Sequence, residues 1–255
     1  MSIDTTEHYN PLVSIILPTY NSANTILDTL FAIKNQTYQN IEVIVVDAFS
    51  KDNTLNLIKK IIPSAIIYNL KPAGDNAARN FAIRKSKGEY LFMLNSDDFI
   101  TSSSIEYLIS HITKNGKDVI FLPVFSRGGL RSKIRFKRRF LSTERVFFAH
   151  SASLMIKRET HIKYGFYTER MPSFSGDVEF LYKLLKGQVS MIVAPYSQSA
   201  YGVYTYGGKS AKGSYLIKLR DEFNFRKKYI FKDINDSIYC LVIVPMSYIY
   251  YHLKM

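Results

Sequence analysis

Asp97 and Asp98 are the residues whose types and spacing most strongly suggest chemistry. They are adjacent and closely follow an apolar stretch that ends at Leu94. Neighbouring carboxylates repel each other unless a cation lies beside them, and Mg²⁺ is commonly held by one or two carboxylates together with substrate phosphates. A plainer interpretation is an acidic turn that caps the helix expected from Ser102. The pair alone leaves both interpretations open.

The elements that must position this pair are predicted by the apolar pattern of the first half of the chain. Short buried runs rich in Ile and Val alternate with segments of helical periodicity. The runs predicted as strands are 13–17, 41–46, 65–68, 90–94 and 119–122. Helices are predicted from Thr25, from Ser50, over 75–87 with Gly88 just past the end, and over 102–114. The alternation indicates βαβ units and an α/β fold with a mostly parallel sheet.

Polar clusters follow the first, second and fourth of these strands. Tyr20 and Asn21 follow the first strand, Asp47 follows the second, and the segment 95–98 follows the fourth. Ligands of open parallel sheets bind at the carboxyl ends of the strands. The placement therefore predicts a binding site at this edge.

Composition narrows the function further. Cys240 is the single cysteine, which excludes a disulfide framework and a cysteine-based zinc site within one chain and favours a cytoplasmic setting. The start of the chain is polar and lacks the pattern of a signal peptide. The net charge of +13 indicates an anionic partner.

Four short motifs, in this order and each near a strand end, carry a resemblance to a known family. They are Pro18-Thr-Tyr-Asn21, Val46-Asp-Ala-Phe-Ser-Lys-Asp-Asn-Thr54, Ala78-Arg-Asn80 followed by Lys87-Gly-Glu-Tyr90, and Asn95-Ser-Asp-Asp98. The order and spacing resemble the nucleotide-binding half of the inverting family-2 glycosyltransferases, over residues 11–125 and more weakly over 146–190. The resemblance implies a GT-A fold, a Rossmann-like, mostly parallel central sheet flanked by helices.

The resemblance also implies roles for individual residues. Tyr20 would stack on the nucleobase of a nucleotide-sugar donor, Asp47 would lie in the segment that contacts base and ribose, and Arg79 would approach the base or diphosphate. Asp97 would contact the ribose or a Mn²⁺ or Mg²⁺ ion, and Asp98 would bind that ion. The remaining nucleotide-binding candidates are Pro18, Asn21, Asn95 and Ser96. For Arg79, an ion pair on the helix surface is the competing interpretation.

The chain departs from the family pattern at two positions. A second acid often follows the first in the second motif, where this chain has Ala48, and the acidic motif often begins with Asp, where this chain has Asn95. The first difference leaves the choice between UDP- and GDP-sugars open. Asn95 can still hydrogen-bond a ribose hydroxyl, so we expect an intact metal site.

Asp177 is the expected catalytic base. Its segment, Ser175 to Phe180, resembles the acceptor-side motif of the family, and an acceptor hydroxyl needs a group that takes its proton. One displacement at the anomeric carbon would invert the configuration. Asp177 could also cap its helix, 177–186. Glu179 and His150 are weaker candidates for contacts with acceptor or diphosphate.

The predicted domain organisation follows from these assignments. A GT-A domain is expected over 1–214, with a nucleotide-binding half (11–125) and an acceptor-side half (126–214). In the second half, strands are predicted over 151–156 and 191–194 and a loop over 199–214. A C-terminal helical extension is expected over 215–255.

A basic run and the apolar C-terminal stretch favour contact with a membrane surface. Residues 127–145 carry eight Lys or Arg and one acid, Glu144. The run could be a solvated loop, or bind nucleic acid or anionic lipid. No nucleic-acid module accompanies it, so no nucleic-acid partner is expected. The uncharged stretch 238–253, which Pro245 interrupts, favours binding to lipid. We therefore expect peripheral attachment at the cytoplasmic face of a membrane. The expected acceptor is a saccharide or a lipid-linked saccharide.

Two other functions compete with a transferase that builds surface polysaccharide or glycan. A sugar nucleotidylyltransferase would need a Gly-rich basic loop after the first strand, where this chain has Pro-Thr-Tyr-Asn. A non-catalytic nucleotide-sugar-binding or scaffold protein is supported by Ala48 and Asn95 and opposed by Asp97, Asp98 and Asp177. A processive synthase is disfavoured because its Trp-containing signature cannot occur in a chain without Trp.

Overall fold

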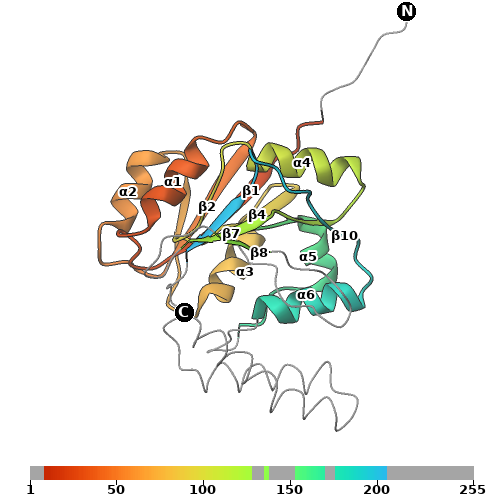
Figure 1. The fold of residues 1–255 in the computed structure, drawn as a ribbon. Helices are drawn as coiled ribbons and strands as arrows, with labels where there is room; N and C mark the ends of the chain where they lie inside the picture. The colour runs from red at the N-terminus through yellow and green to blue at the C-terminus, as the bar shows by residue number, and fades with distance from the viewer. Residues whose placement is uncertain (1–8, 128–134, 138–152, 170–175, 206–255) are drawn as a thin grey trace, which may run out of the picture.

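The predicted strands form the centre of the computed structural model, which describes residues 9–127, 135–137, 153–169 and 176–205 (Figure 1). Within those residues, a seven-stranded sheet has the order β10-β6-β9-β4-β1-β2-β3. Its strands are β1 (Val13–Thr19), β2 (Ile41–Asp47), β3 (Ile66–Asn69), β4 (Tyr90–Met93), β6 (Val119–Phe121), β9 (Leu154–Lys157) and β10 (Met191–Val193). β9 runs antiparallel to both of its neighbours, and the other pairings are parallel. The prediction of a mostly parallel sheet is confirmed.

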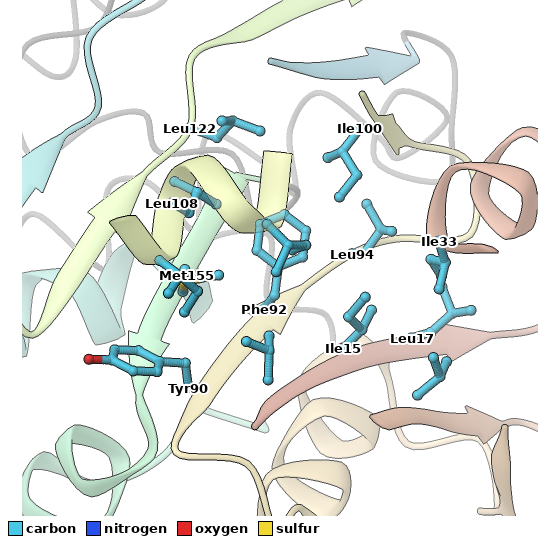
Figure 2. Close-up of a cluster of buried hydrophobic side chains, with 14 of the residues drawn as sticks. Ile15, Leu17, Ile33, Tyr90, Phe92, Leu94, Ile100, Leu108, Leu122 and Met155 are labelled. Carbon is cyan, nitrogen blue, oxygen red and sulfur yellow. The ribbon is translucent and has the colours of Figure 1, made fainter. Parts of the chain in front are cut away.

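Helices cover both faces of this sheet, which explains why its central strands are continuously apolar. The helices are α1 (Ile26–Lys34), α2 (Thr54–Ile61), α3 (Asp75–Lys85), α4 (Ser104–Lys114), α5 (Arg158–Tyr164) and α6 (Gly176–Lys186). α1, α2 and α4 lie on one side, and α3, α5 and α6 on the other (Figure 1). Alternate residues of one strand enter opposite cores, so Ile15 and Leu17 pack under α1 whereas Ile16 packs toward α3. Figure 2 shows the first of these cores, with Phe92 of β4 among its side chains.

A small second sheet, which the sequence analysis did not predict, lies next to the first. Its order is β5-β11-β7-β8, with β5 (Phe99–Ile100), β7 (Val124–Arg127), β8 (Arg135–Lys137) and β11 (Gly202–Thr205). The loop predicted over 199–214 is therefore wrong for Gly202–Thr205. β11 pairs with β5 and β7, which are distant in sequence, and such long-range pairing leaves no local pattern to read.

Gly88 has a different role from the one predicted. α3 ends at Lys85 rather than Lys87, and Ser86 is already extended. Gly88 instead packs against β1, where an added Cβ would lie 2.4 Å from Ser14 Oγ and 2.6 Å from Ser14 N. Its own N–H donates to Ser14 Oγ at 2.9 Å. Glycine is required here by the close approach of two backbones, not by the end of a helix.

Several predicted features lie outside the described residues. These are His150, most of the basic run and the C-terminal helical extension expected over 215–255. Within the described ranges, no helix combines the length and the apolar character needed to cross a membrane.

Candidate active site

The loops that follow β1 and β2 are tied together at the carboxyl edge of the sheet. The N–H of Ala48 donates to Thr19 O at 2.9 Å, and the N–H of Asn21 donates to Ser50 Oγ at 2.8 Å. Asn21 Oδ1 in turn accepts from the N–H of Lys51 at 2.8 Å. The two candidates Tyr20 and Asn21 are exposed in this double loop, whereas Pro18 is buried inside β1.

Asp47 is buried beneath this double loop and organises it. Its Oδ1 accepts from Thr19 Oγ1 at 2.8 Å and from Ser50 Oγ at 2.6 Å. Its Oδ2 accepts from the N–H of Ser50 at 2.7 Å. The side chain is 0% exposed, so Asp47 holds the segment predicted to meet base and ribose rather than presenting its carboxylate to solvent.

The segment 95–98 forms a tight turn after β4, and its two carboxylates differ in accessibility. Asp98 is completely buried, with Oδ1 accepting from the N–H of Thr205 at 3.0 Å and Oδ2 from Asn95 Nδ2 at 2.9 Å. Asp97 is only half-buried. Burial, together with the charge of Asp97, raises the pKa of Asp98 to about 7, although both hydrogen bonds oppose the shift.

A serine pair joins the acidic turn to the loop after β1. Ser22 Oγ and Ser96 Oγ are 2.8 Å apart, and Thr25 Oγ1 donates to Ser96 O at 3.1 Å. One α1 side chain, Thr29, donates to Asp98 O at 2.7 Å. These hydrogen bonds connect the loop after β1, which is predicted to bind the nucleobase, with the turn that is predicted to bind the ribose and the metal ion.

Arg79 connects α3 to the acidic turn. Its Nη2 donates to Asn95 Oδ1 at 2.7 Å and its Nη1 to Asn76 Oδ1 at 3.0 Å. The residue is 7% exposed, so it does not lie on the helix surface, where the competing interpretation placed it. Its charge also acts against the raised pKa of Asp98. A cation next to the turn is an arrangement that suits a phosphate ligand.

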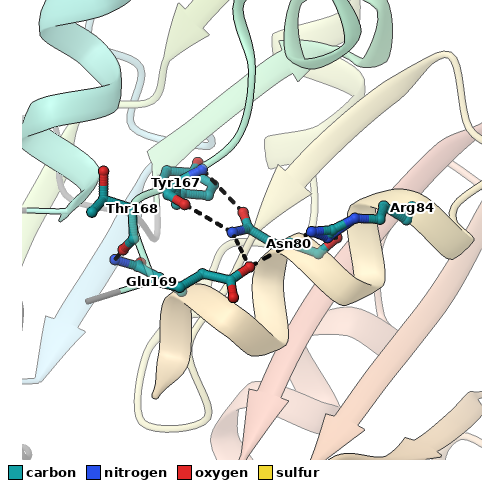
Figure 3. Close-up of polar contacts among 6 residues, drawn as sticks. Asn80, Arg84, Tyr167, Thr168 and Glu169 are labelled. Atoms are coloured by element: carbon teal, nitrogen blue, oxygen red, sulfur yellow. Dashed lines mark hydrogen bonds and ion pairs between the residues drawn. The ribbon is translucent and has the colours of Figure 1, made fainter. Parts of the chain in front are cut away.

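Asn80, the next residue of α3, holds the chain segment that leads toward α6 (Figure 3). Its Nδ2 donates to Tyr167 O at 2.8 Å and to Glu169 Oε1 at 2.7 Å, and its Oδ1 accepts from the N–H of Tyr167 at 3.0 Å. Glu169 also lies 3.6 Å from the guanidinium of Arg84. Adjacent residues of one helix therefore hold the acidic turn and the segment 167–169.

Asp177 lies in the first turn of α6 and is half-buried, as is Glu179. The ring of Tyr167 packs on Phe180 of the same helix with 4.8 Å between centroids, and Arg79 lies 6.0 Å from that ring. Burial, with a contribution from the charge of Asp177, raises the pKa of Tyr167. Tyr167 thus lies between Arg79 and α6, the helix whose first turn contains Asp177.

Sequence reasoning missed Tyr167 and the contact of Thr205 with Asp98. Tyr167 belongs to no motif, and Thr205 acts through its backbone N–H, which any residue other than proline supplies. No signal in the sequence could have identified either one.

Comparison with known proteins identifies the family of this chain. The sequence model of glycosyl transferase family 2 matches residues 14–175. The chain belongs to this family. The matched region includes every nucleotide-binding residue that the sequence predicted, from Pro18 to Asp97.

Related proteins and solved structures agree with the family. The chain is 34% identical over 142 residues to the glucosyltransferase WfaP of Escherichia coli, named for UDP-Glc and α-D-GlcNAc-diphosphoundecaprenol, covering 55% of this chain and 45% of WfaP. TarS of S. aureus with UDP-GlcNAc has a TM-score of 0.67 at 19% identity, covering 88% of this chain and 69% of TarS. The mannosyltransferase PcManGT of Pyrobaculum calidifontis, with GDP-Man and Mn²⁺, has a TM-score of 0.67 at 17% identity, covering 92% and 71%. These two structures confirm the GT-A fold.

The chain spans only part of its curated relatives. It covers between 28% and 57% of the length of the eight relatives compared.

Proposed function

We propose that this protein transfers a sugar from a nucleoside-diphosphate donor to an acceptor hydroxyl, with inversion at the anomeric carbon. The observation that carries the proposal is the buried connection from Arg79 through Asn95 to Asp98 at the carboxyl end of β4. It brings the guanidinium of Arg79 and the carboxylate of Asp98 to the turn that also contains Asp97, beside loops that could hold a nucleoside. These charges support binding of a diphosphate together with a cation. Membership of glycosyl transferase family 2 supports the same reaction.

The nucleoside would bind over the loops after β1 and β2. Tyr20, 39% exposed, would stack on the base, and Asn21 would shape the loop around it. Pro18 and Asp47 are both buried, so they would support these loops from the side away from the nucleoside. Asn95, Ser96 and Asp97 would contact the ribose, and Arg79 the diphosphate. The chemistry admits both UDP- and GDP-sugars, as the ligands of TarS and PcManGT illustrate.

A Mn²⁺ or Mg²⁺ ion would be held by Asp97 and Asp98. No group of three or more His, Cys, Asp or Glu side chains suited to a metal occurs in the part of the chain that the structure describes. Two carboxylates are nevertheless a sufficient protein contribution when diphosphate oxygens complete the ligand set. The ion would neutralise charge on the departing diphosphate.

Asp177 would be the catalytic base. Its carboxylate would take the proton of the acceptor hydroxyl while that oxygen forms a bond to the anomeric carbon. The bond from this carbon to the diphosphate would break with its electron pair going to the diphosphate oxygen. Glu179, in the same turn, and His150, outside the described residues, would contact the acceptor.

The acceptor would be a saccharide. The basic run and the apolar C-terminal stretch favour a saccharide that is linked to a lipid. WfaP is named for an acceptor on diphosphoundecaprenol. The basic run 127–145 could bind the anionic surface of a membrane and would place the protein at its cytoplasmic face. Assembly of surface polysaccharide or glycan would follow from this placement.

The proposal is tested by release of nucleotide from UDP- and GDP-sugars, with Mn²⁺, Mg²⁺ or EDTA. We expect metal-dependent release of one nucleoside diphosphate by the wild type. Asp98→Ala should abolish it, and Asp177→Asn should lower the rate of transfer by a factor of about 10² to 10⁴ while leaving nucleotide affinity unchanged. Asp118→Asn is the matched control and should retain full activity, because Asp118 is a half-buried carboxylate that pairs with Lys157 and belongs to none of the candidate site residues.

Two results would contradict the transferase. No metal-dependent binding of any nucleotide in calorimetry would overturn both the activity and the site. Binding of nucleotide-sugar without turnover, even with extracts that contain lipid-linked acceptors, would favour the alternative of a non-catalytic nucleotide-sugar-binding protein, which Ala48 supports.

A further inference from the structure

Phe49 is an exposed aromatic residue in a backbone conformation that aromatic residues rarely adopt. Its φ is 58° and its side chain is 52% exposed. A positive φ is uncommon for any residue except glycine and is an outlier for a bulky one. Such conformations cluster at functional sites, where the surrounding structure enforces them.

The hydrogen bonds around Phe49 enforce its conformation. On one side, the N–H of Ala48 donates to Thr19 O, and on the other side Ser50 is bound by both oxygens of the buried Asp47. Phe49 lies between these two residues, so its backbone is held in the positive-φ conformation, and its side chain is exposed. The fold therefore accepts a strained backbone and an apolar group in water at the same position.

The same hydrogen bonds set Phe49 opposite Tyr20. Thr19 is joined to Ala48 and Asn21 to Ser50, so the residues between these pairs stand across from each other on adjacent loops. Tyr20 is also exposed, at 39%. Two aromatic side chains thus stand at the carboxyl edge of the sheet, directly after β1 and β2.

We propose that Phe49, together with Tyr20, forms the surface on which the nucleobase of the donor stacks. This inference rests on the proposed function and deepens it. Stacking on aromatic rings contributes to the affinity of every base and needs no particular hydrogen-bonding pattern. It would supply affinity for the base in a chain whose residue 48 is an alanine and offers no polar side chain.

The decisive variant is Phe49→Gly, because it separates strain from binding. Glycine adopts a positive φ without cost, so this variant should unfold at a higher temperature than the wild type. Its Kd for UDP or GDP, whichever the wild type binds, should rise about tenfold, as expected for the loss of one stacking partner. Phe49→Tyr should restore the affinity. Affinity for inorganic pyrophosphate, measured by competition with the bound nucleotide, should stay unchanged.

Phe31→Ala is the control, since Phe31 is 49% exposed on α1, away from the strand ends. It should change neither affinity. A Kd in Phe49→Gly within twofold of the wild-type value, or an equal loss for pyrophosphate, would overturn the stacking role while leaving the transferase intact. A wild type that binds no nucleoside diphosphate would overturn the proposed function and this inference with it.

Discussion

His161 shows how one buried side chain sets a dependence of stability on pH. Its Nδ1 lies 3.2 Å from Gly165 O, and because a carbonyl only accepts, Nδ1 carries the proton of the neutral ring. Nε2 is buried and has no hydrogen-bond partner among the residues that the structure describes. The ring stacks on Phe180 with 4.3 Å between centroids. Burial lowers the pKa of His161 to about 4.

We therefore expect His161 to lower the stability of the fold as the pH falls from about 6.5 to about 4. Asp98 acts in the opposite direction over this range, because its raised pKa of about 7 lets the folded chain bind a proton before the unfolded chain does. Above this window the ring is neutral in both the folded and the unfolded chain. Within it His161 binds its proton first in the unfolded chain, so this residue alone lowers the free energy of unfolding by about 3 kcal/mol. Urea titrations at pH 7 and at pH 4.5 measure this. In His161→Phe, which keeps a ring against Phe180, the free energy of unfolding at pH 7 minus that at pH 4.5 should be lower than in the wild type by most of this amount. An equal value in both proteins would contradict the role of His161.

At the scale of elements, α3 holds two parts of the candidate site through neighbouring side chains. Arg79 binds the acidic turn, and Asn80 binds both backbone polar groups of Tyr167. Since the segment 167–169 precedes α6, the position of α6 relative to the acidic turn depends on this helix.

Asn80→Ala should be strongly destabilising for this reason. It leaves the N–H and C=O of Tyr167 without their partner in a buried environment, at a cost of about 3 kcal/mol in the free energy of unfolding. Urea unfolding measures the cost. Asn115→Ala is the control, because Asn115 makes a hydrogen bond to His111 O that is exposed, and it should cost less than about 1 kcal/mol. Equal costs for the two variants would contradict the importance of the Tyr167 contact.

At the scale of the whole molecule, the site is assembled from loops of the central sheet and from β11 of the second sheet. The N–H of Thr205 in β11 binds Asp98, so the two sheets meet at the acidic turn. A ligand at this turn contacts elements that are remote in sequence, and its binding energy should stabilise the fold as a unit.

We expect the correct nucleoside diphosphate with Mn²⁺ to raise the melting temperature by about 5–10 °C at a hundredfold excess over Kd, corresponding to about 2.7 kcal/mol. EDTA should remove most of the shift, and Asp97→Asn should reduce it. Differential scanning calorimetry measures both. A shift of the same size in the presence of EDTA would argue against a metal in the complex.

Local pattern determined most of the central sheet and the residues of the candidate site. Strands buried on both faces must be apolar throughout, so β1, β2 and β4 stand out in the sequence, and their carboxyl ends place Tyr20, Asp47 and the segment 95–98 at one edge. The family resemblance then identified the reaction class. These features depend on neighbours in sequence, which is why they could be read directly.

Tertiary structure alone decided which of these side chains are accessible and what joins them. Asp47 and Asp98 lie in strand-end motifs like that of the exposed Tyr20, yet both carboxylates are buried and hydrogen-bonded. The role of Tyr167, the strand β11 and the need for glycine at position 88 all arise from contacts between segments far apart in the chain. A residue's burial and partners are properties of the packed chain, so no pattern of residue types along the sequence could have specified them.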